Sequence, residues 1–157
     1  MSARTILLAL ALSCGAAAAQ AQQQPYGPSI TLEAAKKVMA AAEAEAQKAG
    51  VQVAISILDS GGQPVMMHKL DNTQYASIEV AEQKARTALY FKRPSKDLEE
   101  AVTRGGAGLR LVGVKNVTPI AGGLPIVVDG KIVGAIGVSG SNDDTAVAVA
   151  GVAAAGK

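Results

Sequence analysis

The stretch Gly122–Asp144, GGLPIVVDGKIVGAIGVSGSNDD, predicts two strands joined by a very short turn. Its β-branched residues on both sides of the turn favour a pleated, half-buried surface. Asp129 and Gly130 tolerate positive φ at two consecutive positions, as a type I′ hairpin turn requires. The stretch therefore predicts a β-hairpin, and with it a sheet of locally paired strands.

Simple alternation along the returning strand predicts two faces. One face holds Ile132, Gly134, Ile136 and Val138, and the other holds Val133, Ala135, Gly137 and Ser139. Glycine is unfavourable inside a strand because it packs nothing and loses backbone entropy. Gly134 and Gly137 therefore indicate that something approaches the hairpin closely, either a helix packed on the sheet or a bound ligand.

The rest of the chain adds a second hairpin and four helices. Apolar periodicity and end signals predict helices from Thr31 to Gly50, over 74–91, over 96–102 and over 142–155, strands over 51–58 and 64–70, and an irregular segment over 104–119. Local hairpins with helices between them indicate an α+β fold, in which an antiparallel sheet packs against helices.

The N-terminus has the pattern of a bacterial secretory signal peptide. One positive charge, Arg4, precedes an apolar run that ends in the small-residue site Ala19-Gln20-Ala21. This predicts a signal peptide over 1–21, a flexible lead-in over 22–30 and one folded domain over 31–157. Cys14 follows a degraded lipobox, so a lipidated N-terminus at Cys14 is the alternative. Either reading indicates a periplasmic or secreted protein with no membrane span.

Composition excludes several classes of function. Cleavage after Ala21 would remove Cys14, the only cysteine, and with it disulfides and thiolate chemistry. A single histidine cannot build a multi-histidine metal cage within one chain. The net charge of +2 and the scarcity of aromatic residues give no sign of a nucleic-acid partner.

Four stretches resemble the GlcG/HbpS family of heme-binding or heme-degrading domains, also found as the C-terminal part of PduO-type proteins. They are 57–62 (ILDSGG), 77–87 (SIEVAEQKART), 91–94 (FKRP) and 122–126 (GGLPI) continued by 134–140 (GAIGVSG). The resemblance implies a profilin-like antiparallel sheet packed against helices, and assembly into homo-oligomers. It also implies heme or another tetrapyrrole as ligand, whereas other members are associated with glycolate or diol metabolism.

His68 is the first candidate for a heme-iron ligand because it is the only imidazole. Tyr75 and Tyr90 are alternatives for ferric heme. The competing interpretation is that His68 is a half-buried polar residue on a strand.

Lys84 and Arg86 carry the Lys-Ala-Arg pattern of the family. Lys84 falls near the apolar stripe of its predicted helix, where a lysine needs a carboxylate, an anionic ligand or a path to water. Heme propionates or a small carboxylic acid would satisfy it, as would an ion pair with Glu79 or Asp144. The Gly122-Gly123 pair is a further candidate for ligand binding through its backbone N–H groups.

No catalytic constellation is visible, so a binding protein is favoured over a catalyst. The first hypothesis is a periplasmic heme- or tetrapyrrole-binding homo-oligomer. The alternative is an enzyme or enzyme accessory that grips a small hydroxy- or keto-acid with Lys84 and Arg86.

Overall fold

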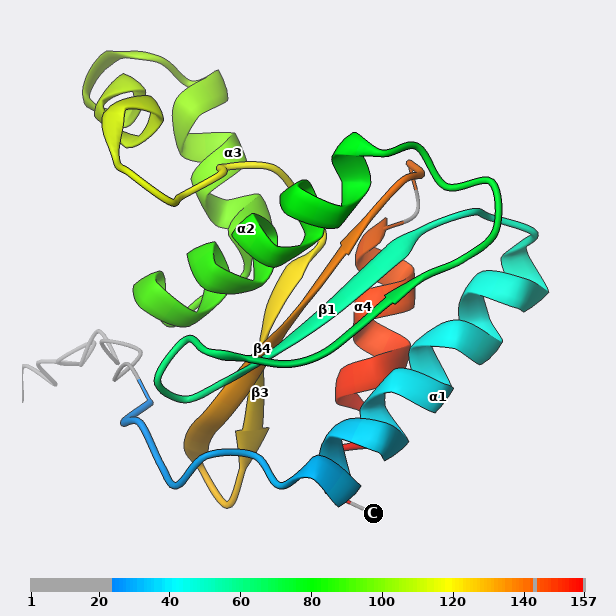
Figure 1. Cartoon of the computed structure of the whole chain (residues 1–157). Helices are drawn as coiled ribbons and strands as arrows, with labels where there is room; N and C mark the ends of the chain where they lie inside the picture. Colours follow the sequence, from blue (N-terminus) through cyan, green and yellow to red (C-terminus); the bar gives the residue numbers. More distant parts are fainter. Residues whose placement is uncertain (1–23, 143, 157) are drawn as a thin grey trace, which may run out of the picture.

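The computed structural model describes residues 24–142 and 144–156, and the chain folds into nine elements within these ranges (Figure 1). In order they are α1 (Leu32–Ala49), β1 (Ala54–Asp59), β2 (Pro64–Lys69), α2 (Ala76–Phe91), α3 (Ser95–Thr103), the 3₁₀ helix η1 (Gly106–Gly113), β3 (Gly123–Val128), β4 (Lys131–Ser139) and α4 (Asp144–Val152). The predicted signal peptide and Cys14 lie outside the described residues. Among the residues described, no helix has the length and apolar character that crossing a bilayer needs.

The sheet has four antiparallel strands in the order β2-β1-β4-β3. Helices α1 and α4 lie on one face and share the larger hydrophobic core, while α2 covers the other face with a smaller core (Figure 1). The two predicted hairpins are therefore the two halves of one sheet, joined at its centre where β1 pairs with β4. The predicted α+β fold is confirmed.

The β3–β4 turn has the predicted backbone, with φ of 50° at Asp129 and 71° at Gly130. The predicted alternation along β4 is wrong at its beginning. Ile126 pairs with Gly134 but Val127 pairs with Ile132, so Val133 is an extra residue in β4. A β-bulge of this kind reverses the facing of the residues before it. Consequently Ile132 packs under α2, and Val133 joins the core under α1 and α4.

The helix ends follow the expected local chemistry. Thr31 Oγ1 accepts a hydrogen bond from the backbone N–H of Ala34 at 3.2 Å and caps the first turn of α1. Gly50 ends α1 in the left-handed conformation, with φ of 66°. The segment predicted to be irregular contains η1, which follows directly after α3.

Residues 25–30, predicted to belong to a flexible lead-in, are hydrogen-bonded to β4. The N–H of Ile132 donates to the carbonyl of Pro25 at 2.9 Å, and the N–H of Gly27 donates to the carbonyl of Ile132 at 2.8 Å. The N–H of Ile30 also donates to the carbonyl of Val133 at 2.8 Å. This part of β4 extends past the end of β1, so the N-terminal segment occupies an edge that β1 leaves open.

Candidate functional site

Helix α2 lies unusually close to the sheet because glycines face it. A Cβ atom on Gly137 would lie 2.0 Å from the carbonyl oxygen of Ala81, and one on Gly123 would lie 2.1 Å from the carbonyl oxygen of Lys84. Both distances are far below contact distance, so a side chain at either position would push the helix away. Of the two explanations for glycine in β4, the packed helix therefore accounts for Gly137.

This close approach brings Lys84 to the C-terminal end of β4, next to the start of α4. Its Nζ donates to Asp144 Oδ2 at 2.7 Å and to the carbonyl oxygen of Val138 at 3.0 Å. The two side chains are only 3% and 9% exposed. The ion pair with Asp144, one of the partners considered from the sequence, thus ties α2 to α4 around the end of β4.

Asp144 has a second role at the same point. Its Oδ1 accepts a hydrogen bond from the backbone N–H of Ser141 at 2.9 Å, which fixes the turn between β4 and α4. Each carboxylate oxygen therefore has a partner within the protein. Because Asp144 balances the charge of Lys84, the pair presents no net positive charge to an incoming anion.

The two candidate glycines pack against this ion pair. Gly122 has φ of 117°, and a Cβ atom there would lie 2.6 Å from the carbonyl oxygen of Val138 and 3.2 Å from Lys84 Nζ. The N–H of Gly123 donates to Ser95 Oγ at 2.8 Å, and that hydroxyl donates to the carbonyl of Ile120 at 2.6 Å. The Gly123 N–H thus connects the start of β3 to the start of α3 through the Ser95 hydroxyl.

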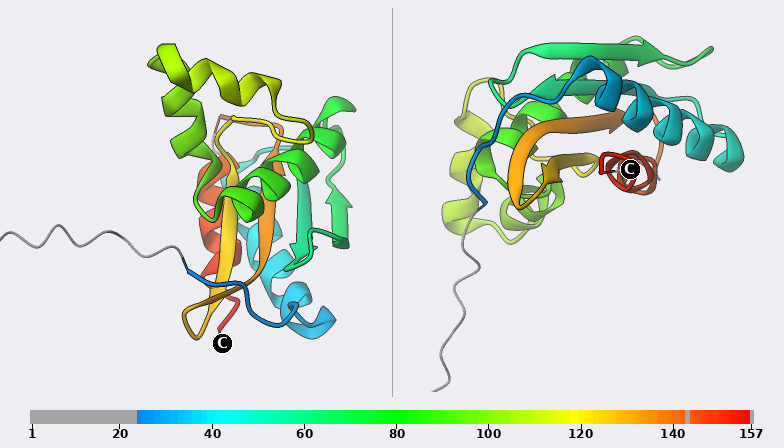
Figure 2. Two further views of the ribbon diagram at one scale, coloured as in Figure 1. Left: turned by 90° about the vertical axis from the view of Figure 1, so that its left-hand side faces the viewer. Right: turned by 90° about the horizontal axis from the view of Figure 1, so that it is seen from below.

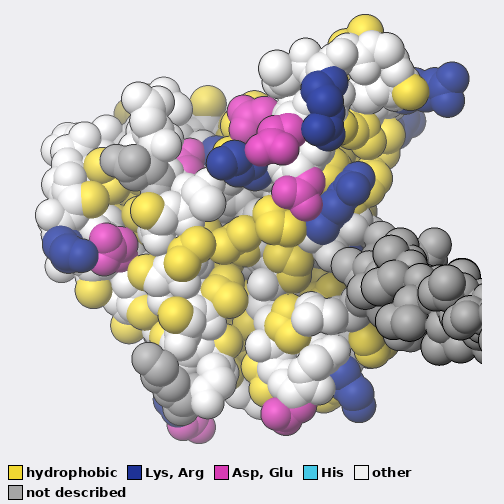
Figure 3. Space-filling view, turned by 180° about the vertical axis from the view of Figure 1, so that it is seen from behind, with side chains coloured by type: hydrophobic (Ala, Val, Ile, Leu, Met, Phe, Trp, Pro, Cys, Tyr) yellow, Lys and Arg dark blue, Asp and Glu magenta, His cyan; other side chains and the backbone are white. Residues whose placement is uncertain are grey.

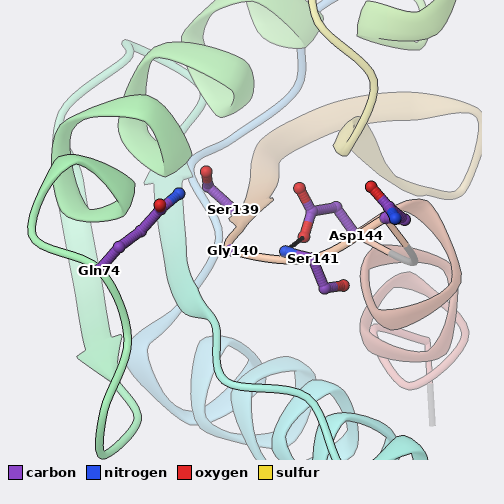
Figure 4. A pocket seen from close by; sticks show the side chains of 6 residues that line it. Gln74, Ser139, Gly140, Ser141 and Asp144 are labelled. Atoms are coloured by element: carbon purple, nitrogen blue, oxygen red, sulfur yellow. Dashed lines mark hydrogen bonds between the residues drawn. The ribbon is translucent and has the colours of Figure 1, made fainter.

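Two hollows flank the turn between β4 and α4. One, of about 340 Å³, is lined by Gln74, Ser139, Gly140, Ser141, Asn142 and Asp144. Figure 4 shows the Gln74 amide directed towards Ser139, with Asp144 bonded to the backbone of Ser141 across the turn. The second, of about 260 Å³, lies beside Lys84 and Glu99 and shares the Ser141–Asp144 turn. The lining of both hollows supplies mainly hydrogen-bonding groups.

Arg86 lies away from the Lys84 pair, two residues along α2. Its guanidinium forms a salt bridge with Glu82, one turn earlier on the same helix. Burial acts to lower the pKa of Arg86, but hydrogen bonds with Tyr90 and Glu82 outweigh it and raise the pKa above the ordinary value. The structure therefore does not bring Lys84 and Arg86 together at one point.

His68 lies on β2, on the side of the sheet that α1 covers. It pairs in register with Ile55, whose side chain belongs to the core under α1. His68 Nδ1 lies 2.6 Å from Glu43 Oε1 on α1, and the histidine side chain is 44% exposed. The imidazole is thus held at one nitrogen by a carboxylate and is accessible to solvent.

The two alternative tyrosines are both on or next to α2. Tyr75 immediately precedes the helix and is 88% exposed, whereas Tyr90 in its last turn is 48% exposed. Within residues 24–142 and 144–156, no three histidine, cysteine or acidic side chains gather as a metal site.

Sequence reasoning missed Glu43 and Ser95. Glu43 is one of several charged residues on α1, and nothing local distinguishes the one that faces β2. Ser95 directly precedes the helix predicted over 96–102, but its hydroxyl binds the β3 backbone across 28 residues. Both contacts depend on how distant elements pack.

The fold and these contacts define a small α+β domain with a four-stranded antiparallel sheet between helices. The family model described as haem degrading protein HbpS-like matches residues 30–153. The chain belongs to this HbpS-like family, as the resemblance predicted.

Individual relatives agree with this assignment. Protein GlcG of Escherichia coli strain K12 is 36% identical to the chain, covering 70% of it and 81% of GlcG. The crystal structure of HbpS is 31% identical with a TM-score of 0.77, and the match covers 83% of this chain and 93% of HbpS. The crystal structure of a PduOC–heme complex is 28% identical with a TM-score of 0.74, covering 80% of this chain and 94% of that one.

Proposed function

We propose that this chain is an exported heme- or tetrapyrrole-binding protein of the HbpS type, and that His68 is the iron ligand. It belongs to a family of haem degrading proteins, and a relative of similar fold has been crystallised with heme. The observation that supports His68 is its 2.6 Å contact with Glu43 through Nδ1.

A carboxylate at one imidazole nitrogen is the usual support for a metal-binding histidine. When Nδ1–H donates to a carboxylate, the tautomer is fixed and the lone pair of Nε2 is left for a metal. His68 has this partner, and its side chain is 44% exposed. The donor set on this side of the sheet therefore fits an axial ligand to heme, which when bound supplies an iron centre that accepts the imidazole.

The surroundings of His68 also suit a flat apolar ligand. The pairing register puts Met66 on the same side of β2 as His68, and both Met66 and Leu70 pack partly buried against the core under α1. Thioether and aliphatic side chains favour contact with an aromatic macrocycle over water. Two described hollows are polar and a third, of about 200 Å³, is mainly apolar, but His68 lines none of them. The proposed heme site is therefore this open surface, covered by a second copy of the chain in a homo-oligomer.

Hemin titration of the purified protein, followed by absorbance, tests the proposal. We expect a saturable Soret shift that His68→Ala abolishes. Glu43→Gln should weaken hemin binding by roughly 10- to 100-fold, as loss of an outer partner does at metal-bound histidines. Tyr75→Phe and Tyr90→Phe are the matched controls and should titrate like the wild type.

Two outcomes contradict the proposal at different levels. A Soret shift that survives His68→Ala and is lost in a tyrosine variant would keep heme and reject His68 as its ligand. Absence of any saturable shift in the wild type would reject heme binding itself.

The second candidate is an enzyme or enzyme accessory that binds a small hydroxy- or keto-acid. The observation in its favour is the polar hollow of about 260 Å³ beside Lys84. Thermal stabilisation by glycolate or pyruvate, lost in Asn142→Leu and without any hemin response, would support this candidate over the first.

Export has a separate test. The intact mass of the protein recovered from the periplasmic fraction should correspond to residues 22–157. A heavier species that begins at Cys14 would instead support lipidation, and full-length protein confined to the cytoplasm would contradict export.

A further inference from the structure

The segment from Ser95 to Ile120, here called the arm, projects from one end of the sheet (Figure 2, left). It contains α3 and η1. α3 buries Ser95 and Leu98, but η1 has no buried residue. Among the described elements, η1 packs on α3 alone. The outer half of the arm therefore has no core of its own.

Several exposed side chains of residues 104–120 are aliphatic, among charged and polar ones. Leu109 is 56% exposed and Val112 is 65% exposed, and Val114 and Ile120 are exposed as well. A 3₁₀ helix of eight residues is longer than such helices usually run without support. Contiguous exposed aliphatic surface on a soluble domain commonly marks an interaction site. The arm thus needs a partner surface that is itself partly apolar.

The two parts of the arm carry opposite charges, so the arm of one copy is complementary to the arm of another. Residues 104–120 carry three cations, Arg104, Arg110 and Lys115, and no acidic residue. The α3 helix carries Asp97, Glu99 and Glu100 against a single lysine, and Asp97 and Glu100 are exposed. Figure 3 shows the arm at upper right, with cationic and hydrophobic side chains on it and acidic side chains gathered towards the body.

We propose that the arm is the face through which two copies of this chain pair, with η1 of each copy lying over α3 of the other. A two-fold axis brings the same patch of both subunits together, so each cationic end meets an acidic helix and the aliphatic side chains cover one another. An anionic membrane surface fits less well, because the acidic face of α3 lies in the same projection. The inference rests on the proposed homo-oligomer, and the arm is a contact surface separate from the His68 face of β2, because α3 and η1 do not pack on β2 or α1.

Equilibrium sedimentation of the purified protein tests the apolar part of this face. Val112→Asp should raise the dissociation constant of the dimer by roughly tenfold or more, because a carboxylate would be buried in the interface. Leu32→Asp is the matched control, because Leu32 is 53% exposed on α1, outside the arm. The control should dissociate like the wild type.

A charge exchange tests the pairing itself. Arg110→Glu and Glu100→Arg should each weaken dimerisation severalfold, since each places like charges opposite one another. The double variant Arg110→Glu/Glu100→Arg should recover most of the loss, because the two charges meet between subunits. Circular dichroism of each variant establishes that the fold is retained.

The result that overturns the proposal is a wild-type protein that remains monomeric, or a dimer that both Val112→Asp and the single charge variants leave unchanged. Additive rather than compensating effects of the two charge reversals would also overturn the stated pairing. Hemin titration of the same variants separates the two proposals. A dimer disrupted by Val112→Asp in a protein that never binds hemin would sustain the arm interface and reject the proposed function.

Discussion

Two pairs of polar side chains in this molecule each join a helix to a distant segment, and they differ in burial. Lys84 and Asp144 are almost fully buried, and their charged atoms are also bonded to the protein backbone. His68 and Glu43 are partly exposed, with 44% and 28% of their side chains accessible. The first pair has both charges satisfied within the fold, whereas the second leaves one face of an imidazole open.

This difference in burial distinguishes a pair with a structural role from a pair that could bind a ligand. Burying a charge costs several kcal/mol unless a partner is present, so Lys84 and Asp144 each depend on the other. An exposed pair contributes little to stability and can exchange a partner without loss of the fold. Lys84, at first a candidate for binding an anion, is engaged in holding α2 to α4, and His68 is the residue whose geometry is free to change.

The largest expected effect is that of breaking the buried pair. Lys84→Ala leaves Asp144 buried without its cation and should lower the free energy of unfolding by about 3–5 kcal/mol. Urea denaturation measures this loss. Lys96→Ala, at an exposed lysine on α3, is the control and should change stability by less than about 0.5 kcal/mol. Similar losses in the two variants would show that burial does not distinguish Lys84.

Removing both charges should be less damaging than removing one. Lys84→Met/Asp144→Leu replaces the pair by apolar side chains, which fill a similar volume without a stranded charge. We expect its free energy of unfolding to lie closer to the wild type than that of Lys84→Ala. Some loss should persist because Asp144 also accepts the Ser141 N–H. A double variant less stable than the single one would contradict this account.

The exposed pair should contribute little to stability even though it matters for hemin. A double-mutant cycle on His68→Ala and Glu43→Ala should give a coupling energy of about 1 kcal/mol or less. A coupling above about 3 kcal/mol would place this pair with the buried one. The comparison between the two pairs would then fail.

The smallest expected effect is that of salt, which should act on the exposed pair and not on the buried pair. In about 1 M NaCl the screening length falls to roughly 3 Å, so the part of the His68–Glu43 coupling that depends on a protonated His68 should be screened. The loss caused by Lys84→Ala should stay the same within about 0.5 kcal/mol, because ions do not reach a buried pair. Equal salt dependence at both sites would contradict the difference in burial.

Local chemistry in the sequence predicted most of the fold. The Thr31 cap, the Gly50 terminus and the Asp129-Gly130 turn each depend on a few adjacent residues, and all three are confirmed. The register of β4 could not be read in this way, because a bulge depends on pairing with β3. The contacts of residues 25–30 with β4 likewise depend on where β1 ends.

The candidate site was less accessible to sequence reasoning. The pattern at Lys84 indicated that this lysine needs a partner, but Asp144 and Glu79 could be separated only by the packing of α4 against the sheet. The pairing of His68 with Glu43 spans 25 residues and two elements. Arg86 follows Lys84 by two residues, so helical geometry already points the two side chains apart.

The extra residue in β4 bears on how chains of this fold can change in length. If Val133 were deleted, Ile132 would directly precede Gly134 and strand alternation would continue without interruption. Every other side chain of β4 would keep its present face, and the losses would be the Val133 side chain and the hydrogen bond from Ile30. The bulge is therefore a position in this hydrophobic strand where one residue can be removed without reversing the faces of the others, whereas a deletion elsewhere in β4 would reverse every residue on one side of it.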